Sequence, residues 1–319
     1  MKNSVKHLIR FLGFRSRKYI DCCFERDAMI YSTNSGLQGD TTAVIGAKIR
    51  IICHTIEKAL SLTDCRGDFG KQKIENLINL YNVYKDSVLP DKNTLDIAES
   101  TIRVYADHRK RHSLDSSWIP SSLIENDSTG IPCGAQMISA DQTDFKEFCH
   151  IAESRHSIRN YSLRPIEHND IINAVKIAQT APSACNRQAT RIYAITDSDK
   201  INALKQRHGG IRTFGMPSVI FVISQDLNLY ISEYERNTWL VDGGIFCMNF
   251  LYALDSVGIV NCPVIWGGMD DEDTFLSELV GIPQNERVAV LVVGGYPPEH
   301  GVKAPCSPKR PVEDILQII

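Results

Sequence analysis

Two short polar clusters carry residue types that bind an anion and the edge of a flat ring. The first is Arg155-His156-Ser157-Ile158-Arg159, in which two arginines four residues apart flank a serine. On a helical turn this spacing places both guanidinium groups and the hydroxyl on one side. Guanidinium groups bind phosphate oxygens through paired, charge-assisted hydrogen bonds. The first cluster therefore predicts a phosphate-binding site.

The second cluster is Ala181-Pro182-Ser183-Ala184-Cys185-Asn186-Arg187-Gln188. Its short polar side chains both donate and accept hydrogen bonds, which suits the edge of a heteroaromatic ring. Cys185 lies within it, and two interpretations of this thiol remain open, contact with a bound ring or simple packing.

A helix is predicted between the two clusters. It follows Pro165 and ends before Pro182, because proline cannot continue a helix. Its apolar residues recur at helical spacing, and they are Ile171, Ile172, Val175, Ile177 and Ala178.

In this order, R-x-S-x-R, a helix after proline and A-P-S-x-x-N-x-Q resemble the nitroreductase family of FMN-dependent flavoproteins. The resemblance covers residues 145–319. It implies that the first cluster holds the FMN phosphate and ribityl chain, and that the second lies against the flavin. The residues assigned in this way are Arg155, Ser157, Arg159, Pro182, Ser183, Asn186 and Gln188.

Two later motifs extend the resemblance. Glycine permits close approach of a backbone N–H to a ligand, and the family places such a turn at flavin N5, so Gly267 and Gly268 are assigned there. A basic residue near the C-terminus binds the FMN phosphate in the family, which implies Arg310, with Lys309 as its substitute.

The resemblance implies an FMN-dependent oxidoreductase working by a ping-pong mechanism. NADH or NADPH reduces the flavin at N5 and leaves, and an unidentified small-molecule acceptor then takes its place. It also implies a homodimer with FMN at the subunit interface, the helix at 239–257 in the dimer core, and a C-terminal tail that reaches the partner. No side chain is singled out as a catalytic acid or base.

Two alternatives remain open. One is a flavin-dependent dehydrogenase or oxidase acting on a biosynthetic intermediate, whose pocket the N-terminal region supplies. A second, looser resemblance belongs with it. The H-x-x-E-K helix at His54, Glu57 and Lys58, followed by the turn Arg66-Gly67-Asp68-Phe69-Gly70, resembles longer family members associated with surface-polysaccharide biosynthesis. The other alternative is a flavin-binding interaction protein without turnover.

Composition narrows the function classes further. The chain has 319 residues, with 35 basic and 38 acidic side chains, so no overall positive field attracts nucleic acid. Its ten cysteines include no C-x-x-C pair, which favours reduced thiols and a cytoplasmic location, and no metal site is predicted. No apolar run is long enough to cross a bilayer.

The resemblance implies an α+β protein with a nitroreductase-like mixed sheet flanked by helices, and periodicity predicts a mainly helical region before it. The expected parts are a helical region at 1–117, a linker or ordered loop at 118–142, and an FMN-binding domain at 143–319. Strands are predicted at 191–196, 219–224 and 287–293, and helices at 47–62, 74–88, 201–209, 239–257 and 273–280.

Two features of the N-terminal region admit a functional interpretation. His54, Glu57 and Lys58 share one helix face, which predicts either a solvated polar face or a contribution to a substrate cleft. Apolar residues at helical spacing among basic ones between Lys2 and Lys18 predict an amphipathic helix. It either packs on the protein or makes weak contact with an anionic membrane surface.

Overall fold

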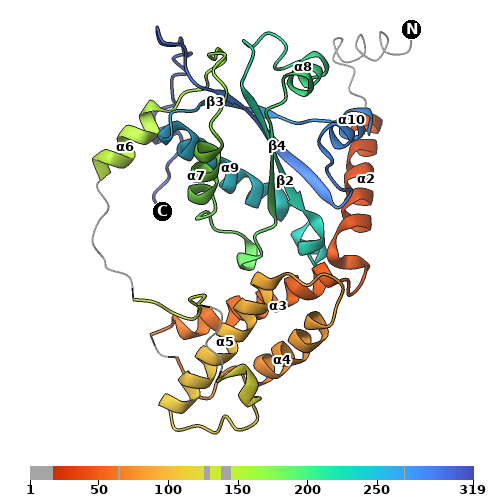
Figure 1. The fold of residues 1–319 in the computed structure, drawn as a ribbon, viewed down its shortest axis with the longest axis vertical. Coiled ribbons are helices and arrows are strands. Elements are labelled where there is room, and N and C mark those ends of the chain that lie inside the picture. Colours follow the sequence, from red (N-terminus) through yellow and green to blue (C-terminus); the bar gives the residue numbers. More distant parts are fainter. Residues whose placement is uncertain (1–16, 64, 126–129, 138–144, 269) are drawn as a thin grey trace.

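The computed structural model describes residues 17–63, 65–125, 130–137, 145–268 and 270–319. They form a helical part and a sheet domain, which Figure 1 shows one above the other. The amphipathic helix predicted between Lys2 and Lys18 falls almost wholly outside the described residues.

Three helices form the lower part, α3 (Thr42–Leu60), α4 (Lys71–Lys85) and α5 (Lys92–Arg111). Their apolar stripes meet in a core that includes Ile49, Ile74 and Tyr105. The Asp91 carboxylate begins α5 by accepting hydrogen bonds from the backbone N–H groups of Asn93 and Thr94. The helical periodicity of the sequence is therefore confirmed in this bundle.

Helix α2 (Arg17–Asn34) precedes this bundle in sequence but packs on the sheet domain. Its Arg26 pairs with Asp273, Nη2 to Oδ2 at 2.6 Å, and Asp27 pairs with Arg287, Oδ1 to Nη2 at 2.9 Å. Figure 1 shows α2 beside α10. The expected part at 1–117 thus contributes to both halves of the molecule.

The sheet has the strand order β1-β2-β4-β3. Its strands are β1 (Thr190–Ile195), β2 (Val219–Asp226), β3 (Val260–Ile265) and β4 (Glu286–Gly295). All three strand pairs are antiparallel, and the parallel pairing is a single bridge between Ser157 and Asn261 beside the edge strand β3. The α+β class is confirmed. Of the predicted mixed sheet, the parallel part among the described residues is that one bridge.

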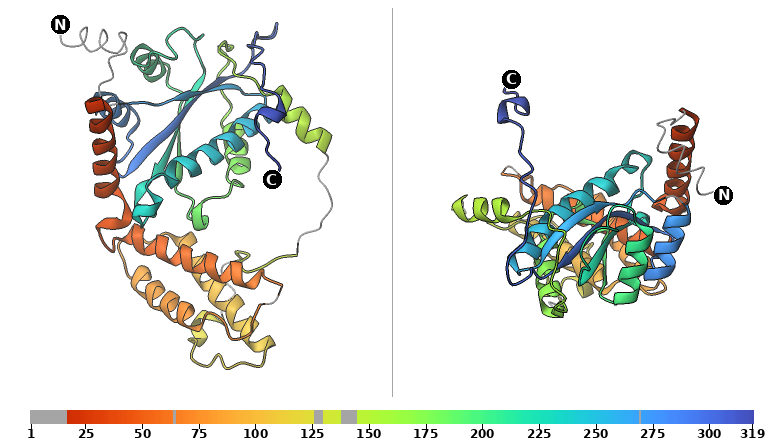
Figure 2. Two further views of the ribbon diagram at one scale, coloured as in Figure 1. Left: turned by 180° about the vertical axis from the view of Figure 1, so that it is seen from behind. Right: turned by 90° about the horizontal axis from the view of Figure 1, so that it is seen from above.

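Helices cover both faces of the sheet. On one face α7 (His168–Ala178) and α9 (Thr238–Ser256) pack against residues such as Phe221 and Val292. On the other, α8 (Ser198–Arg207) and α10 (Asp270–Val280) enclose alternate residues such as Ile220 and Leu291. The view from above in Figure 2 shows this layering. The near-continuous apolar run of β2 follows from burial on both faces.

Helix α9 is only partly buried in the single chain, although its sequence predicted burial on most faces. An added Cβ at Gly243 would lie 2.8 Å from the Ala289 Cβ, so this glycine permits close packing on β4. Gly244 has no such neighbour. The apolar side chains that α9 leaves exposed are Leu240, Val241, Ile245 and Met248.

The remaining described elements connect these layers. Helix α6 (Phe145–Ser154) leads into the first polar cluster. The chain beyond β4 has no regular structure apart from one short turn, and it extends away from the body in Figure 2. Short 3₁₀ turns occur at Gly36–Gln38, Ser121–Leu123, Ala184–Asn186, Leu227–Leu229, Glu233–Glu235 and Val312–Asp314.

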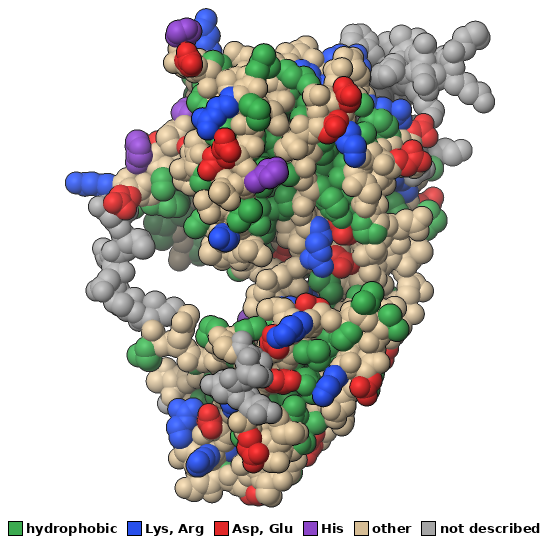
Figure 3. Space-filling model, viewed as in Figure 1, with side chains coloured by type: hydrophobic (Ala, Val, Ile, Leu, Met, Phe, Trp, Pro, Cys, Tyr) green, Lys and Arg blue, Asp and Glu red, His purple; other side chains and the backbone are tan. Residues whose placement is uncertain are grey.

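Within the described residues, no helix has the length and apolar character required to span a membrane. On the face drawn in Figure 3, basic and acidic side chains are interspersed, in keeping with the nearly balanced charge of the sequence. All ten cysteines are free thiols in the structure.

Candidate functional site

The first polar cluster is extended rather than helical, which corrects the expected geometry. Helix α6 ends at Ser154, and the Ile158 N–H donates to the Asn261 carbonyl of β3 at 2.9 Å. Side chains two residues apart share a face in extended chain. Buried Ile158 therefore points inward, while Arg155, Ser157 and Arg159 remain together on the opposite face.

These three side chains lie close enough to the Cys262 thiol of β3 to influence its pKa. Burial raises the pKa of Cys262, and Arg159, the Ser157 hydroxyl and Arg155 act in the opposite direction. The Arg155 Nη1 atom is buried and has no hydrogen-bond partner within the described part of the chain. A buried N–H without a partner is costly. An oxyanion bound at this face would satisfy it.

Gly267 and Gly268 follow β3 directly, and the structure separates their roles. An added Cβ at Gly268 would lie 2.6 Å from Asp273 Oδ1 and 2.7 Å from Trp266 Nε1, so packing requires a glycine there. An added Cβ at Gly267 would meet no atom within 4 Å among the described residues beyond its chain neighbours, and Gly267 is exposed. Of the two, Gly267 is the position open to a ligand.

The second polar cluster is a loop with unusual backbone conformations. Cys185, Asn186 and Gln188 all have positive φ, at 50°, 51° and 55°. The Ser183 hydroxyl accepts a hydrogen bond from the Gln188 N–H at 3.1 Å, and the Gln188 side-chain amide donates to Asn186 Oδ1 at 3.2 Å. Non-glycine residues in this region are strained and cluster at functional sites.

A buried network supports this loop from behind. Arg187 Nε donates to the Ala184 carbonyl at 3.0 Å, and Arg187 Nη1 donates to Glu235 Oε2 at 3.0 Å. The Asp242 carboxylate of α9 accepts from the Ala184 N–H at 3.2 Å and from the Tyr230 hydroxyl at 3.0 Å. Sequence reasoning missed these supports, and the available signal was an aspartate within an otherwise apolar helix.

Replacing Asp242 by asparagine should change how stability depends on pH. Burial raises the pKa of Asp242 above its usual value of 3.8. A group whose pKa is higher in the folded than in the unfolded state stabilises the fold at pH values below its unfolded-state pKa. This stabilisation is lost as the pH rises through the folded-state pKa. The stability of the wild type relative to Asp242→Asn should therefore fall with rising pH, measured by urea unfolding from about pH 4 to about pH 8. A constant difference across this range would contradict the assignment.

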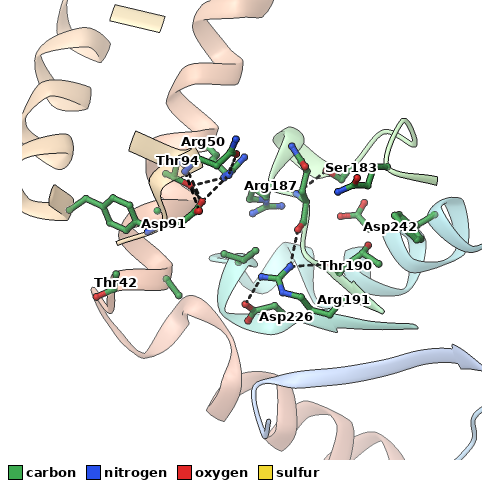
Figure 4. Close-up of a pocket in the computed structure, with 18 of the residues that line it drawn as sticks. Thr42, Arg50, Asp91, Thr94, Ser183, Arg187, Thr190, Arg191, Asp226 and Asp242 are labelled. Atoms are coloured by element: carbon green, nitrogen blue, oxygen red, sulfur yellow. Dashed lines mark hydrogen bonds and ion pairs between the residues drawn. The ribbon is translucent and has the colours of Figure 1, made fainter. Parts of the chain in front are cut away.

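A cavity of about 600 Å³ separates the strained loop from the helical bundle. Its walls include Arg50 and Asp91 from the bundle, Ser183 and Arg187 from the loop, and Asp242 from α9. Figure 4 shows Arg50 and the loop on opposite sides of this space.

A second cavity of about 270 Å³ lies beside it and shares Arg50, Asn93 and Gln188 with the first. His54 and Glu57 line it, with His54 Nδ1 4.0 Å from Glu57 Oε2, whereas Lys58 is exposed and is not among its lining residues.

The two polar clusters do not meet within one chain. Ser157 is bridged to Asn261, which is aligned across β4 with Val219, the first residue of β2. The second cluster instead leads into Ala189, which accepts a hydrogen bond from the N–H of Asp226, the last residue of β2. The eight residues of β2 place these ends roughly 24 Å apart.

The remaining predicted residues are exposed. Lys309 and Arg310 lie on the C-terminal arm, which Figure 2 shows extending from the body, and Pro182 lines the larger cavity. Among the described residues, no group of three or more histidine, cysteine or acidic side chains is arranged to hold a metal ion.

Comparison with known proteins places this geometry in context. The model of the nitroreductase family matches residues 152–210, which include both polar clusters. An NADPH-flavin oxidoreductase from Vibrio harveyi is 26% identical over 49% of this chain and 68% of its own length. A nitroreductase structure in complex with FMN from Desulfovibrio desulfuricans covers 56% of this chain and 98% of its own, at 17% identity and a TM-score of 0.46.

An Archaeoglobus fulgidus protein named for NADH dehydrogenase and NAD(P)H nitroreductase activities is 32% identical over 149 residues, 45% of this chain and 82% of the relative. This identity over most of the relative's length, together with the family-model match across both clusters, shows that the chain belongs to the nitroreductase family.

Proposed function

We propose that this protein is an FMN-dependent oxidoreductase that takes electrons from NADH or NADPH and passes them to a small-molecule acceptor. The observation that carries the proposal is the shared face of Arg155, Ser157 and Arg159, with the buried Arg155 Nη1 lacking a protein partner among the described residues. Two guanidinium groups and a hydroxyl suit a phosphate monoester. Family membership and a flavin-reducing relative support the same cofactor class.

The residues divide the binding task. Arg155, Ser157 and Arg159 hold the FMN phosphate, with Arg310 or Lys309 adding charge from the C-terminal arm. The open backbone at Gly267 faces the ring edge, and Asn186 and Gln188 contact the flavin from the strained loop. Bound FMN supplies two-electron hydride chemistry. The protein positions the reactants.

The separation of the two clusters supports a homodimer in which each flavin site uses both chains. One protomer contributes the phosphate-binding face, and its partner contributes the strained loop. The exposed apolar side chains of α9 and of the C-terminal arm provide surfaces for such an interface, and those on the arm are Val312, Ile315, Leu316, Ile318 and Ile319.

Mixed dimers test this arrangement. An Arg155→Ala/Arg159→Ala chain and an Asn186→Ala/Gln188→Ala chain should each bind FMN poorly alone. Unfolding and refolding them together should restore FMN in one of the two sites of each mixed dimer, because that site receives both intact halves. FMN content is measured after separating the mixed dimer by differential tags. No recovery in mixed dimers would show that each site lies within one chain.

Anaerobic reduction tests the activity. The FMN-loaded protein should lose its oxidised-flavin absorbance when NADH or NADPH is added, and a small-molecule acceptor should restore it. The cavities between the loop and the helical bundle also favour a second candidate function, a flavin-dependent dehydrogenase acting on a biosynthetic intermediate. A flavin that stays oxidised with both nicotinamides would favour this second candidate and refute the first.

A further inference from the structure

Arg50 of α3, in the helical bundle, lines both cavities. Its guanidinium is fixed from one side, because Nε donates to the Thr94 hydroxyl at 3.0 Å and Nη2 donates to Asn93 Oδ1 at 2.8 Å. Nη2 also lies 3.2 Å from Asp91 Oδ2. Its remaining nitrogen, Nη1, is buried and has no hydrogen-bond partner in the described portion of the protein. Only 12% of the Arg50 side chain is exposed.

The charge of Arg50 is less fully neutralised than that of the arginine buried behind the loop. Arg187 is paired with Glu235 at 1% and 23% side-chain exposure. The Asp91 carboxylate beside Arg50 is 53% exposed, so water screens its attraction for the guanidinium. Arg50 therefore places a positively charged guanidinium, held in one orientation, at the wall of both cavities.

The opposite wall belongs to the proposed flavin site. Asn186 and Gln188, from the strained loop, line the smaller cavity together with Arg50, His54 and Glu57. A molecule bound here would touch the loop on one side and the bundle on the other. Figure 4 shows Arg50 across the space from Ser183 and Arg187.

We propose that the N-terminal bundle supplies the acceptor-binding site, and that Arg50 selects acceptors carrying an oxyanion, either a carboxylate or a phosphate. This inference rests on the proposed flavin chemistry and assigns the substrate class of the same site. The Arg50 guanidinium donates a charge-assisted hydrogen bond to the oxyanion, while His54, Glu57 and Asn93 contact the polar remainder of the molecule. Because the other donors of Arg50 are already fixed, binding requires little further ordering of its side chain.

Binding to the FMN-loaded protein is the first test, because FMN then occupies the other arginine cluster. The probes are benzoate, phenyl phosphate and neutral benzyl alcohol, measured by calorimetry and by perturbation of the flavin spectrum. Arg50→Gln should weaken binding of the preferred anion about tenfold or more, as expected for loss of a charge-assisted hydrogen bond. Benzyl alcohol should bind equally weakly to both proteins. The anion that binds wild type more tightly identifies the group.

The matched control is Arg111→Gln, because Arg111 is exposed on α5 and donates to the Asp107 carbonyl outside the cavities. It should leave anion binding unchanged. Equal losses in Arg50→Gln and Arg111→Gln, or unchanged binding in Arg50→Gln, would overturn the proposal. If Arg50→Gln fails to fold, the wild-type protein alone tests the proposal. Equal affinity of the wild type for benzyl alcohol and for both anions would overturn anion selection.

Turnover separates this inference from the proposed function. Arg50→Gln should lower kcat/KM for para-nitrobenzoate relative to para-nitrobenzyl alcohol by about tenfold, while the rate of anaerobic flavin reduction by NADH stays within about twofold of wild type. An equal fall for both nitro compounds would refute anion selection while leaving the flavin assignment intact. Failure of NADH to reduce the wild-type flavin would instead refute the proposed function.

Discussion

Replacing Arg155 and Arg159 together by alanine is expected to give a folded protein that binds FMN about two to four orders of magnitude more weakly. Each guanidinium contributes a charge-assisted contact of about 1.5–3 kcal/mol with a phosphate. The fold should survive for two reasons. Arg159 is exposed, and the Arg155 Nη1 atom has no hydrogen-bond partner among the described residues, so its removal leaves no acceptor there unpaired. The measurements are visible absorbance after purification, FMN titration, and thermal unfolding.

Arg212→Ala is the control for this loss of charge. Arg212 is exposed and donates to the Gln206 carbonyl at 2.7 Å, away from the extended segment. It should retain FMN fully. Stoichiometric FMN in the Arg155→Ala/Arg159→Ala protein would remove the phosphate assignment, whereas loss of FMN in both proteins would indicate a general effect of net charge.

Replacing Arg187 by alanine is expected to lower the free energy of unfolding by about 3–5 kcal/mol, because it leaves the partner of a buried ion pair uncompensated. The Arg187 side chain is 1% exposed and Glu235 is 23% exposed. The same change removes the hydrogen bond from Arg187 Nε to the Ala184 carbonyl, which helps to hold the strained loop. FMN affinity should therefore fall with stability, measured by urea unfolding and FMN titration.

Arg191 provides a control in the adjoining strand, since it also pairs with a carboxylate. Its side chain is 42% exposed in the pair with Asp226, so Arg191→Ala should cost about 1 kcal/mol or less. A similar destabilisation by both substitutions would show that burial of the Arg187 pair does not govern the stability of the loop.

The edge strand β3 shows where sequence patterns are insufficient. Its sequence, Val-Asn-Cys-Pro-Val-Ile, contains proline and asparagine, which disfavour a strand, and no strand was predicted there. Proline is tolerated at a sheet edge, where its missing N–H breaks no ladder on the outer side. Position in the sheet, which pairing with β4 determines, therefore outweighed local propensity.

The spacing of Arg155, Ser157 and Arg159 did not by itself decide between a helical and an extended backbone. Positions i, i+2 and i+4 share a face in extended chain, while i and i+4 share one in a helix, so both backbones bring the arginines together. The hydrogen bond from Ile158 to Asn261 selects the extended form. In a helix Ser157 would face away from the two arginines, so the expected helical grouping of all three side chains was wrong, and the extended backbone is what gives them a shared face. Their role in phosphate binding stays a prediction.

The sequence by itself determined the family resemblance, the α+β class and most of the helices and strands, and it predicted a role for the two polar clusters, because these depend on local periodicity and short-range spacing. Tertiary structure decided which distant residues meet. It placed Arg50, His54 and Glu57 opposite Asn186 and Gln188, supported the loop with Asp242 and Glu235, and held the two clusters at opposite ends of β2. Such contacts join residues from separate elements, and their pairing is fixed by how whole faces pack, which no local pattern records.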